Sequence, residues 1–203
     1  MQELKLMKLN WAERWAVNNP GRIIEQRLEI RAFCQMKQVS PGARVLEIGC
    51  GRGAGAQLLL EKYEPAALHL LDLDIEMIVK ARRRLAQHNR TRVFSFVGDA
   101  LHLPYRDQTF DALFGFGVLH HVPDWRGGLA EIARVLKPGG CYFFEELYPS
   151  LYQNFITRHI LLHPTENRFK SEDWISALRQ QNLRVIKTFE QKMLGILGAA
   201  VKE

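Results

Sequence analysis

The feature that most constrains the fold is a glycine-rich segment that links a short apolar run to a helix-forming one. Residues 44–48 are largely apolar and β-favouring, long enough for one buried strand, and residues 57–63 have the composition of a helix. The glycines between them allow a sharp turn and leave backbone N–H groups open to a ligand, and the helix directs its positive end toward any anionic group there. This order predicts a nucleotide site at the carboxyl end of a parallel strand.

The same segment fits two classes of cofactor. Gly49, Gly51 and Ala54 satisfy the G-x-G-x-x-A pattern of dinucleotide-binding folds, which is a weak signal on its own. The string VLEIGCGRGAG at residues 45–55 more closely resembles the first motif of the S-adenosylmethionine-dependent methyltransferases with a Rossmann-like fold. In that family an acid stands two positions before the first glycine, as Glu47 does here. A glycine turn without any ligand is the third alternative.

An acid follows the second predicted strand, residues 67–71. Asp72 stands twenty-one residues after Gly51, the spacing at which such folds place a carboxylate for the ribose hydroxyls. A carboxylate suits this role because it accepts two hydrogen bonds from a vicinal diol. Asp74 is the rival acid, but its position favours the N-cap of a helix over residues 75–85.

Two further segments match the methyltransferase pattern in the expected order. A third strand, 92–97, runs into Gly-Asp-Ala, which resembles the turn in which the family binds adenine, with Asp99 and Ala100 in the binding positions. An aspartate that caps its own turn is the alternative for Asp99. The string RVLKPGG ends an amphipathic helix over 125–136 and precedes a strand at 141–145, as in these enzymes.

The end of the fourth predicted strand, 112–116, carries the candidate catalytic residues. The following segment resembles the family's L-H-H-V sequence and places His120 and His121 where this strand meets the reaction cleft. Glu146, after the fifth strand, is the third candidate for a general base, which is required only if the acceptor must lose a proton. None of these residues has the spacing of a metal site, and we predict no metal.

The resemblance covers about residues 40–146 and implies S-adenosylmethionine as the cofactor and in-line methyl transfer to a small acceptor. It implies an α/β fold with a Rossmann-like, doubly wound, seven-stranded, mostly parallel sheet, an antiparallel C-terminal strand pair and an N-terminal helical cap. One domain spans 1–203, divided into an N-terminal helical segment (1–39), a cofactor-binding core (40–146) and an acceptor-side segment with closing strands (147–203). The implied cofactor-binding residues are Glu47, Gly49, Cys50, Gly51, Gly53, Asp72, Leu73, Asp99, Ala100 and Gly117.

The two ends of the chain are less informative. An apolar residue recurs every four positions from 22 to 38, which predicts an amphipathic helix, and the last elements are a helix at 171–181 and strands at 183–189 and 194–201. Two segments are apolar enough to cover an acceptor: 1–20, with Trp11 and Trp15, and 147–163, with Tyr148, Tyr152 and Phe155. We predict that they form a mobile cover. The alternative is that both segments simply pack on the core.

Composition is that of an ordinary globular protein, with 47% hydrophobic and 25% charged residues and a net charge of +6. No apolar run reaches membrane-spanning length, and the scattered Cys34, Cys50 and Cys141 form no C-x-x-C pair, which predicts a reduced cytoplasmic setting. Between Glu76 and Asp99 there is no acid but six basic residues. That stretch is either a solvated helix face or a footprint for nucleic acid or an anionic membrane.

The methyl acceptor is the least constrained feature. The absence of N-P-P-[YF] after the fourth strand counts against methylation of the exocyclic amines of DNA or of protein glutamine. The apolar segment 147–163 with surplus positive charge favours a hydrophobic or anionic, lipid-like small molecule. Residues 98–125 resemble quinone-biosynthesis methyltransferases and their small-molecule relatives. An RNA methyltransferase, a nicotinamide-dependent oxidoreductase and a noncatalytic S-adenosylmethionine-binding protein are the alternatives.

Overall fold

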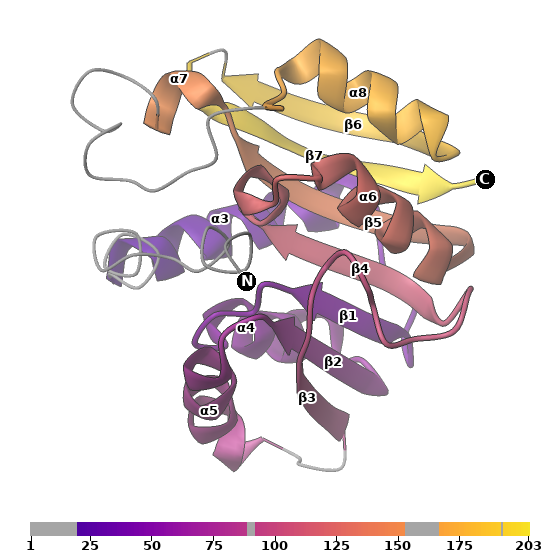
Figure 1. The fold of residues 1–203 in the computed structure, drawn as a ribbon. Helices are drawn as coiled ribbons and strands as arrows, with labels where there is room; N and C mark the ends of the chain where they lie inside the picture. The colour runs from indigo at the N-terminus through magenta and orange to yellow at the C-terminus, as the bar shows by residue number, and fades with distance from the viewer. Residues whose placement is uncertain (1–19, 89–91, 153–166, 192) are drawn as a thin grey trace.

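One seven-stranded sheet organises the chain, in the order β3-β2-β1-β4-β5-β7-β6. The computed structural model describes residues 20–88, 92–152, 167–191 and 193–203. All pairings are parallel except those of β7, whose arrow points the opposite way in Figure 1. The strands are β1 (Arg44–Ile48), β2 (Ala67–Asp72), β3 (Val93–Val97), β4 (Phe110–Phe116), β5 (Leu136–Leu147), β6 (Leu183–Gln191) and β7 (Gly195–Lys202). The predicted fold class is confirmed.

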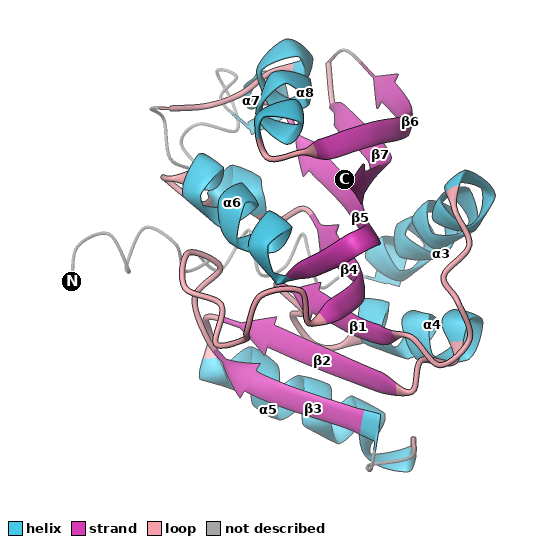
Figure 2. Cartoon of the chain, turned by 90° about the vertical axis from the view of Figure 1, so that its right-hand side faces the viewer, coloured by secondary structure: helices cyan, strands magenta, loops and turns pink. Residues whose placement is uncertain are grey.

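Helices cover both faces of this sheet (Figure 2). One face packs against α3 (Pro20–Met36), α4 (Ala54–Tyr63) and α5 (Ile75–Arg84), and the other against α6 (Trp125–Val135) and α8 (Ser171–Gln180). Three short elements complete the described chain: the 3-10 turns η1 (Leu85–Gln87) and η3 (Leu119–His121), and the one-turn helix α7 (Pro149–Tyr152). A strand buried on both faces requires a nearly continuous apolar run, which is why β1 was recognisable in the sequence.

Side chains alternate along β1 between two separate cores. Leu46 and Ile48 belong to the core beneath α6 and α8, whereas Val45 belongs to the core beneath α3, α4 and α5. Aromatic rings fill the first of these cores, where Trp125 and Trp174 are fully buried with ring centroids 5.7 Å apart. Burying a side chain of this size stabilises the fold by roughly 1.5–3 kcal/mol or more. The two cores hold the sheet rigid and bring the carboxyl ends of its parallel strands together at one edge.

Several predicted element bounds were too short. The helix predicted from residue 57 begins at Ala54, directly after the glycine turn. The fourth strand begins at Phe110, which pairs with Leu136, so β5 also starts earlier than predicted. The register then shifts before the next pair, and Gly139 has a φ of +77° within this stretch. The Pro-Gly segment was expected to form a turn between the helix and a strand beginning at Cys141, but it lies within β5 as an irregularity.

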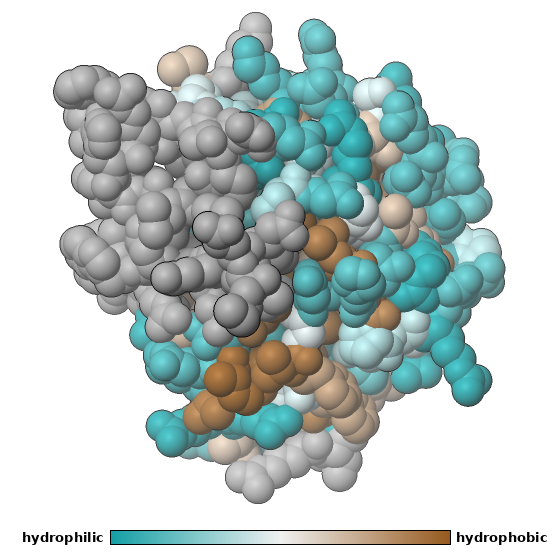
Figure 3. Space-filling model, in the orientation of Figure 1, coloured by the Kyte–Doolittle hydropathy of each residue, from teal (hydrophilic) through white to brown (hydrophobic). Residues whose placement is uncertain are grey.

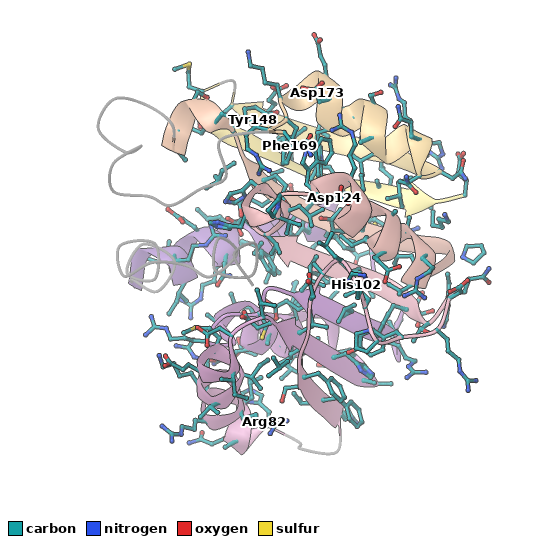
Figure 4. The ribbon with its side chains drawn as sticks, viewed as in Figure 1. Arg82, His102, Asp124, Tyr148, Phe169 and Asp173 are labelled. Atoms are coloured by element: carbon teal, nitrogen blue, oxygen red, sulfur yellow. The ribbon has the colours of Figure 1, made fainter. Side chains whose placement is uncertain are left out.

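The predicted cover over the acceptor is wrong for Tyr148. Its side chain is buried in the core beneath α6 and α8, together with Phe169, and its hydroxyl donates to Glu190 Oε1 at 3.0 Å (Figure 4). Residues 1–19 and 153–166, which include Trp11 and Trp15, lie outside the described residues. None of the described helices is long and apolar enough to cross a membrane.

Candidate active site

Three glycines with left-handed backbone form the turn after β1. Gly49, Gly51 and Gly53 have φ angles of +62°, +51° and +76°. A Cβ on Gly49 would lie 2.6 Å from Val118 Cγ2, whereas a Cβ on Gly51 would meet nothing within 4 Å. Gly49 is therefore required by the packing of the protein itself. Gly51 borders open space at the carboxyl edge of the sheet, where a ligand can approach the backbone.

Asp72 ties this turn to the end of β2. Its Oδ2 accepts a hydrogen bond from Gly51 N at 2.8 Å, and its Oδ1 accepts one from Asp74 N at 2.9 Å. The rival acid, Asp74, has the predicted capping role, since its Oδ1 accepts from Glu76 N at the start of α5. Asp72 thus stands beside the glycine turn as predicted. Leu73, between the two acids, is half-buried.

Glu47 is a buried carboxylate next to the same turn. Its side chain is 1% exposed, and its Oε2 has no hydrogen-bond partner. Burial, with the negative charge of Asp72 nearby, raises the pKa of Glu47 well above its usual range. Burial likewise raises the pKa of the neighbouring Cys50 thiol. An unpartnered buried carboxylate is costly, and a cationic group bound at the turn would offset that cost.

The third predicted binding segment follows β3. Asp99 Oδ1 accepts a hydrogen bond from Leu101 N at 2.9 Å, which is the self-capping turn weighed as the alternative. Ala100 is 8% exposed and packs in the core beneath α6 and α8. The G-D-A segment therefore forms a defined turn at the same sheet edge as Asp72. Its use for adenine stays a prediction.

His120 and Glu146 form a buried pair at the ends of β4 and β5. His120 Nδ1 lies 2.9 Å from Glu146 Oε2, and the backbone N–H groups of Leu119 and His120 donate to the two oxygens of this carboxylate at 2.9 and 3.0 Å. Burial raises the pKa of Glu146 to about 8, against the lowering effect of the backbone donors. The half-buried ring of His121 lies 4.2 Å from the His120 ring, centroid to centroid. The structure thus brings the three predicted catalytic candidates together.

Gly117 leaves the space that the His120 ring occupies. Its φ is +71°, and a Cβ there would lie 3.1 Å from Glu145 Oε2 and 3.3 Å from His120 Cε1. Its N–H donates to Glu145 O at 2.8 Å, which joins the end of β4 to β5. Gly117 was assigned to the cofactor site by resemblance alone. The structure places it between the histidine pair and a second charged cluster.

That second cluster was missed in the sequence. Arg22, in the first turn of α3, lies 2.8 Å from both Glu29 Oε1 and Glu145 Oε2. Burial raises the pKa of Glu29 to about 8 and that of Glu145 above its usual value, and Arg22 opposes both shifts. Arg22 and Glu145 are 123 positions apart. Neither belongs to a recognised motif, so no sequence signal connected them.

Arg168 is a second residue that sequence reasoning missed. Its guanidinium donates to the backbone oxygens of His120 at 2.6 Å and of Val122 at 3.1 Å. It therefore fixes the turn that carries the two histidines from outside the methyltransferase motifs. Among the described residues, no group of three or more His, Cys, Asp or Glu side chains is arranged to hold a metal ion.

Residues 45–140 match a family model described as a methyltransferase domain. A fatty-acid O-methyltransferase from Mycolicibacterium smegmatis is 41% identical over 108 residues, which are 53% of this chain and 38% of that protein. A phthiotriol/phenolphthiotriol dimycocerosates methyltransferase from Mycobacterium ulcerans is 39% identical over 109 residues, 54% of this chain and 39% of that protein. The chain thus covers about two fifths of the length of these two relatives.

A solved structure extends the similarity beyond the matched segment. Geranyl diphosphate C-methyltransferase from Streptomyces coelicolor A3(2) superposes with a TM-score of 0.75 at 16% identity, over 96% of this chain and 90% of that one. At this identity the likeness concerns the fold alone. The family match, together with the fold, identifies residues 45–140 as a methyltransferase domain of the S-adenosylmethionine-dependent, Rossmann-like class.

Proposed function

We propose that this chain transfers a methyl group from S-adenosylmethionine to the oxygen of a lipid-like acceptor. The observation that carries the donor assignment is the glycine turn with Glu47 beneath it, a buried carboxylate whose Oε2 lacks a partner. A donor whose amino-acid end carries an ammonium group matches this carboxylate in charge. NAD has no amino-acid end and no ammonium group. Asp72, already at the turn, is the natural acceptor for the ribose hydroxyls.

The remaining donor contacts follow from position along the carboxyl edge. Gly49, Gly51 and Gly53 would supply close backbone approach, and Asp99 with Ala100 would bind adenine after β3. When bound, the donor supplies a methyl group on a positive sulfur, which is already activated toward a nucleophile. The protein then has mainly to align the acceptor with that methyl and exclude water.

His120, held by Glu146, is the residue we assign to proton removal from a hydroxyl acceptor. Glu146 faces Nδ1 at 2.9 Å and orients the imidazole. In its ionised form, which the pKa of about 8 favours at higher pH, it would accept from Nδ1–H and leave Nε2 as the nitrogen that can take a proton. His121, in ring contact with His120, is the more exposed of the two and serves to position the acceptor. An acceptor that is already a carboxylate would need no base, and only positioning would remain.

The acceptor class is proposed from the relatives and from charge. The two relatives are named for fatty acids and for phthiotriol dimycocerosates, both long-chain lipids. A net charge of +6 favours an anionic or membrane-held acceptor. A long-chain fatty acid or a hydroxylated lipid satisfies both observations.

Two measurements test this proposal in order. Calorimetry should show saturable binding of S-adenosylmethionine and S-adenosylhomocysteine and none of NAD. Transfer of labelled methyl should then be screened against fatty acids, hydroxylated lipids, quinols and RNA, with the Asp72→Ala variant as the control for donor-dependent signal. NAD binding without a response to the methyl donor would reject the donor assignment. Donor binding without labelling of any lipid would reject the acceptor class.

A further inference from the structure

An exposed apolar surface runs along the edge of the sheet opposite to β6. Figure 3 shows it as a brown area over β3 and α5. We call it the β3–α5 face. Large apolar side chains normally avoid this degree of exposure in such numbers on one surface. Its exposed apolar residues are Ile75 (55%), Val79 (39%), Phe94 (40%), Phe96 (42%) and Val97 (49%).

Every charged residue after Glu76, up to the end of β3, is basic. Glu76 is the last acid before Asp99, and it forms an ion pair at 3.8 Å with Lys80. The exposed cations of the described part of this stretch are Lys80, Arg82, Arg83, Arg84 and Arg92. Ile75, Val79 and Arg83 line one shallow hollow with Glu76 and Lys80, so apolar and basic groups share a single surface.

The free edge of β3 is not available for strand addition at its centre. Arg82 reaches from α5 to β3, as Figure 4 shows, and its Nε and Nη2 donate to Ser95 Oγ at 2.6 Å and Ser95 O at 2.7 Å. An added peptide strand needs the outer backbone acceptors of the edge strand. Because Arg82 occupies the acceptor in the middle of β3, a β-strand partner is disfavoured. The side chains around it stay exposed.

The layer beneath Phe94 and Phe96 adds no charge to this surface. His69, 7% exposed, stacks on Phe94 with centroids 4.9 Å apart, and neither of its ring nitrogens has a hydrogen-bond partner. Burial, with Arg44 nearby, lowers the pKa of His69 to about 4. The ring is therefore neutral at physiological pH. The described surface consists of apolar groups flanked by arginine and lysine, with Glu76, paired to Lys80, as the acid among them.

We propose that the β3–α5 face docks on an anionic lipid bilayer. Two features together hold peripheral proteins at a membrane. Apolar side chains enter the boundary between headgroups and acyl chains, and flanking cations attract anionic lipid. Among the described residues of the opposite edge, exposed apolar side chains, including Met193 (68%) and Leu194 (39%), stand among charges of both signs. There Ile186 and Phe189 are exposed, but Glu190 and Glu203 stand among the cations, and Arg184 is paired with Glu203 at 2.8 Å.

Docking on this face would bring the site to the membrane. Asp72 and Asp99 are the proposed donor ligands; Asp72 ends β2 and Asp99 stands two residues after β3. The exposed Ile75 and Val97 lie within three residues of them in the chain. A lipid acceptor would then reach the site from the bilayer without crossing water. The delivery of a lipid acceptor to the site rests on the proposed function, whereas the docking itself does not.

Flotation with lipid vesicles tests the docking without any methyl transfer. The chain should float with vesicles of phosphatidylcholine and phosphatidylglycerol, float weakly with phosphatidylcholine alone, and be released by high salt. Arg83→Ala with Arg92→Ala should weaken binding about thirtyfold, which corresponds to ~1 kcal/mol for each cation. Val79→Ser with Phe96→Ser should weaken it about tenfold or more.

The β6 edge supplies matched controls. Ile186 and Phe189 are 39% and 47% exposed, close to Val79 and Phe96, so Ile186→Ser with Phe189→Ser should leave flotation unchanged, as should Arg184→Ala with Lys187→Ala. Each variant is checked by its melting temperature and by donor binding. The proposal would be overturned if the wild-type chain did not float. It would also be overturned if the double variants on the β3–α5 face and those on the β6 edge lost vesicle binding equally. RNA binding or self-association that the β3–α5 variants abolish without any vesicle binding would overturn it as well. Flotation without lipid methylation would reject the proposed acceptor and leave the docking standing.

Discussion

The candidate site lies at the carboxyl-terminal ends of the parallel strands and has two sides. Next to β1–β3 it is made mainly of backbone, whereas next to β4 and β5 it is made of buried ionisable side chains. The first side has three glycines with positive φ, and Asp72 accepts from two backbone N–H groups. The second side has the His120–Glu146 pair and the Arg22–Glu145 pair, in which burial raises the pKa of both carboxyls.

The two constructions suit two different demands. Under the proposed function, a donor shared by a whole family would be held by backbone geometry, which requires particular residue types at particular spacings. An acceptor that differs among relatives would be met by side chains, whose pairing depends on the fold rather than on a motif. We therefore expect variants on the first side to change donor affinity or folding, and variants on the second to change the transfer rate. The following predictions test that division, from the largest effect to the smallest.

The largest effect is expected from the histidine pair. His120→Ala should lower the rate of methyl transfer to a hydroxyl acceptor by about 10²–10⁴-fold and leave donor affinity unchanged, because the base is lost. Glu146→Gln should have a similar effect, since either orientation of the amide sets an N–H against the backbone N–H of Leu119 or His120. The double variant should lose no more transfer activity than the less active of the two single variants, because the two residues act as a unit. The exposed His102 provides the control.

The next effect compares two glycines of the same turn. Gly49→Ala combines left-handed strain with a close contact to Val118 and should lower the free energy of unfolding by about 2–5 kcal/mol. Gly51→Ala has strain alone and should cost about 1–2 kcal/mol, yet it places a methyl group where the donor approaches. Thermal unfolding and calorimetry separate the two. Equal loss of stability in both variants would contradict the assignment of Gly51 to the ligand side.

Stability should depend on pH through the buried carboxyls, which are Glu47 on the β1–β3 side and Glu146 and Glu29 on the β4–β5 side. Burial raises the pKa of Glu146 and of Glu29 to about 8, so the folded state holds these protons where the unfolded chain releases them. The free energy of unfolding should therefore fall by up to a few kcal/mol as pH rises from about 4.5 to about 8. Glu146→Gln should flatten this slope, and Glu172→Gln, at an exposed position, should not. Stability that rises over this window would contradict the burial of neutral carboxyls.

The sequence predicted the backbone side far better than the side-chain side, for physical reasons. The bounds of β1 match the prediction, because a doubly buried parallel strand is largely apolar and this one ends where the glycines begin. Asp74 was separated from Asp72 by its capping position alone. These features depend on residues close in the chain, whose local conformation limits which types fit.

The side-chain contacts of the β4–β5 side were not predicted, because they join residues that are distant in the chain. Arg22 meets Glu145 across 123 positions, and Arg168 binds the carbonyl of His120 across 48. No spacing rule anticipates such pairs. The histidines were found only by resemblance, and their pairing with Glu146 required the register of β4 and β5. Tyr148 was misjudged because an aromatic residue after a strand can serve a core or a cover equally well in sequence.

On the proposed donor side, Asp72 at the end of β2 and Asp74 just after it should separate affinity from stability. Asp72→Ala removes the carboxylate proposed for the ribose and should weaken donor binding by about 2–4 kcal/mol. Asp74→Ala removes the cap on Glu76 N and should cost about 1 kcal/mol of stability with little change in affinity. Calorimetry and thermal unfolding of both variants measure the contrast. If the two behave the other way round, the donor site lies two residues further along the chain than proposed.

The smallest effect concerns whether the segment after β5 belongs to the core or to the acceptor side. Tyr148→Phe removes only the hydroxyl that donates to Glu190 at 3.0 Å and keeps the buried ring, so it should cost about 1 kcal/mol of unfolding free energy. Ser171→Ala, which removes the other hydroxyl bonded to Glu190, should cost a similar or smaller amount and serves as the matched control. Neither should alter methyl transfer, because both bonds join β6 to neighbouring elements rather than to the site. A tenfold loss of transfer in Tyr148→Phe, with stability unchanged, would instead place this hydroxyl in the acceptor pocket and extend the side-chain half of the site beyond β5.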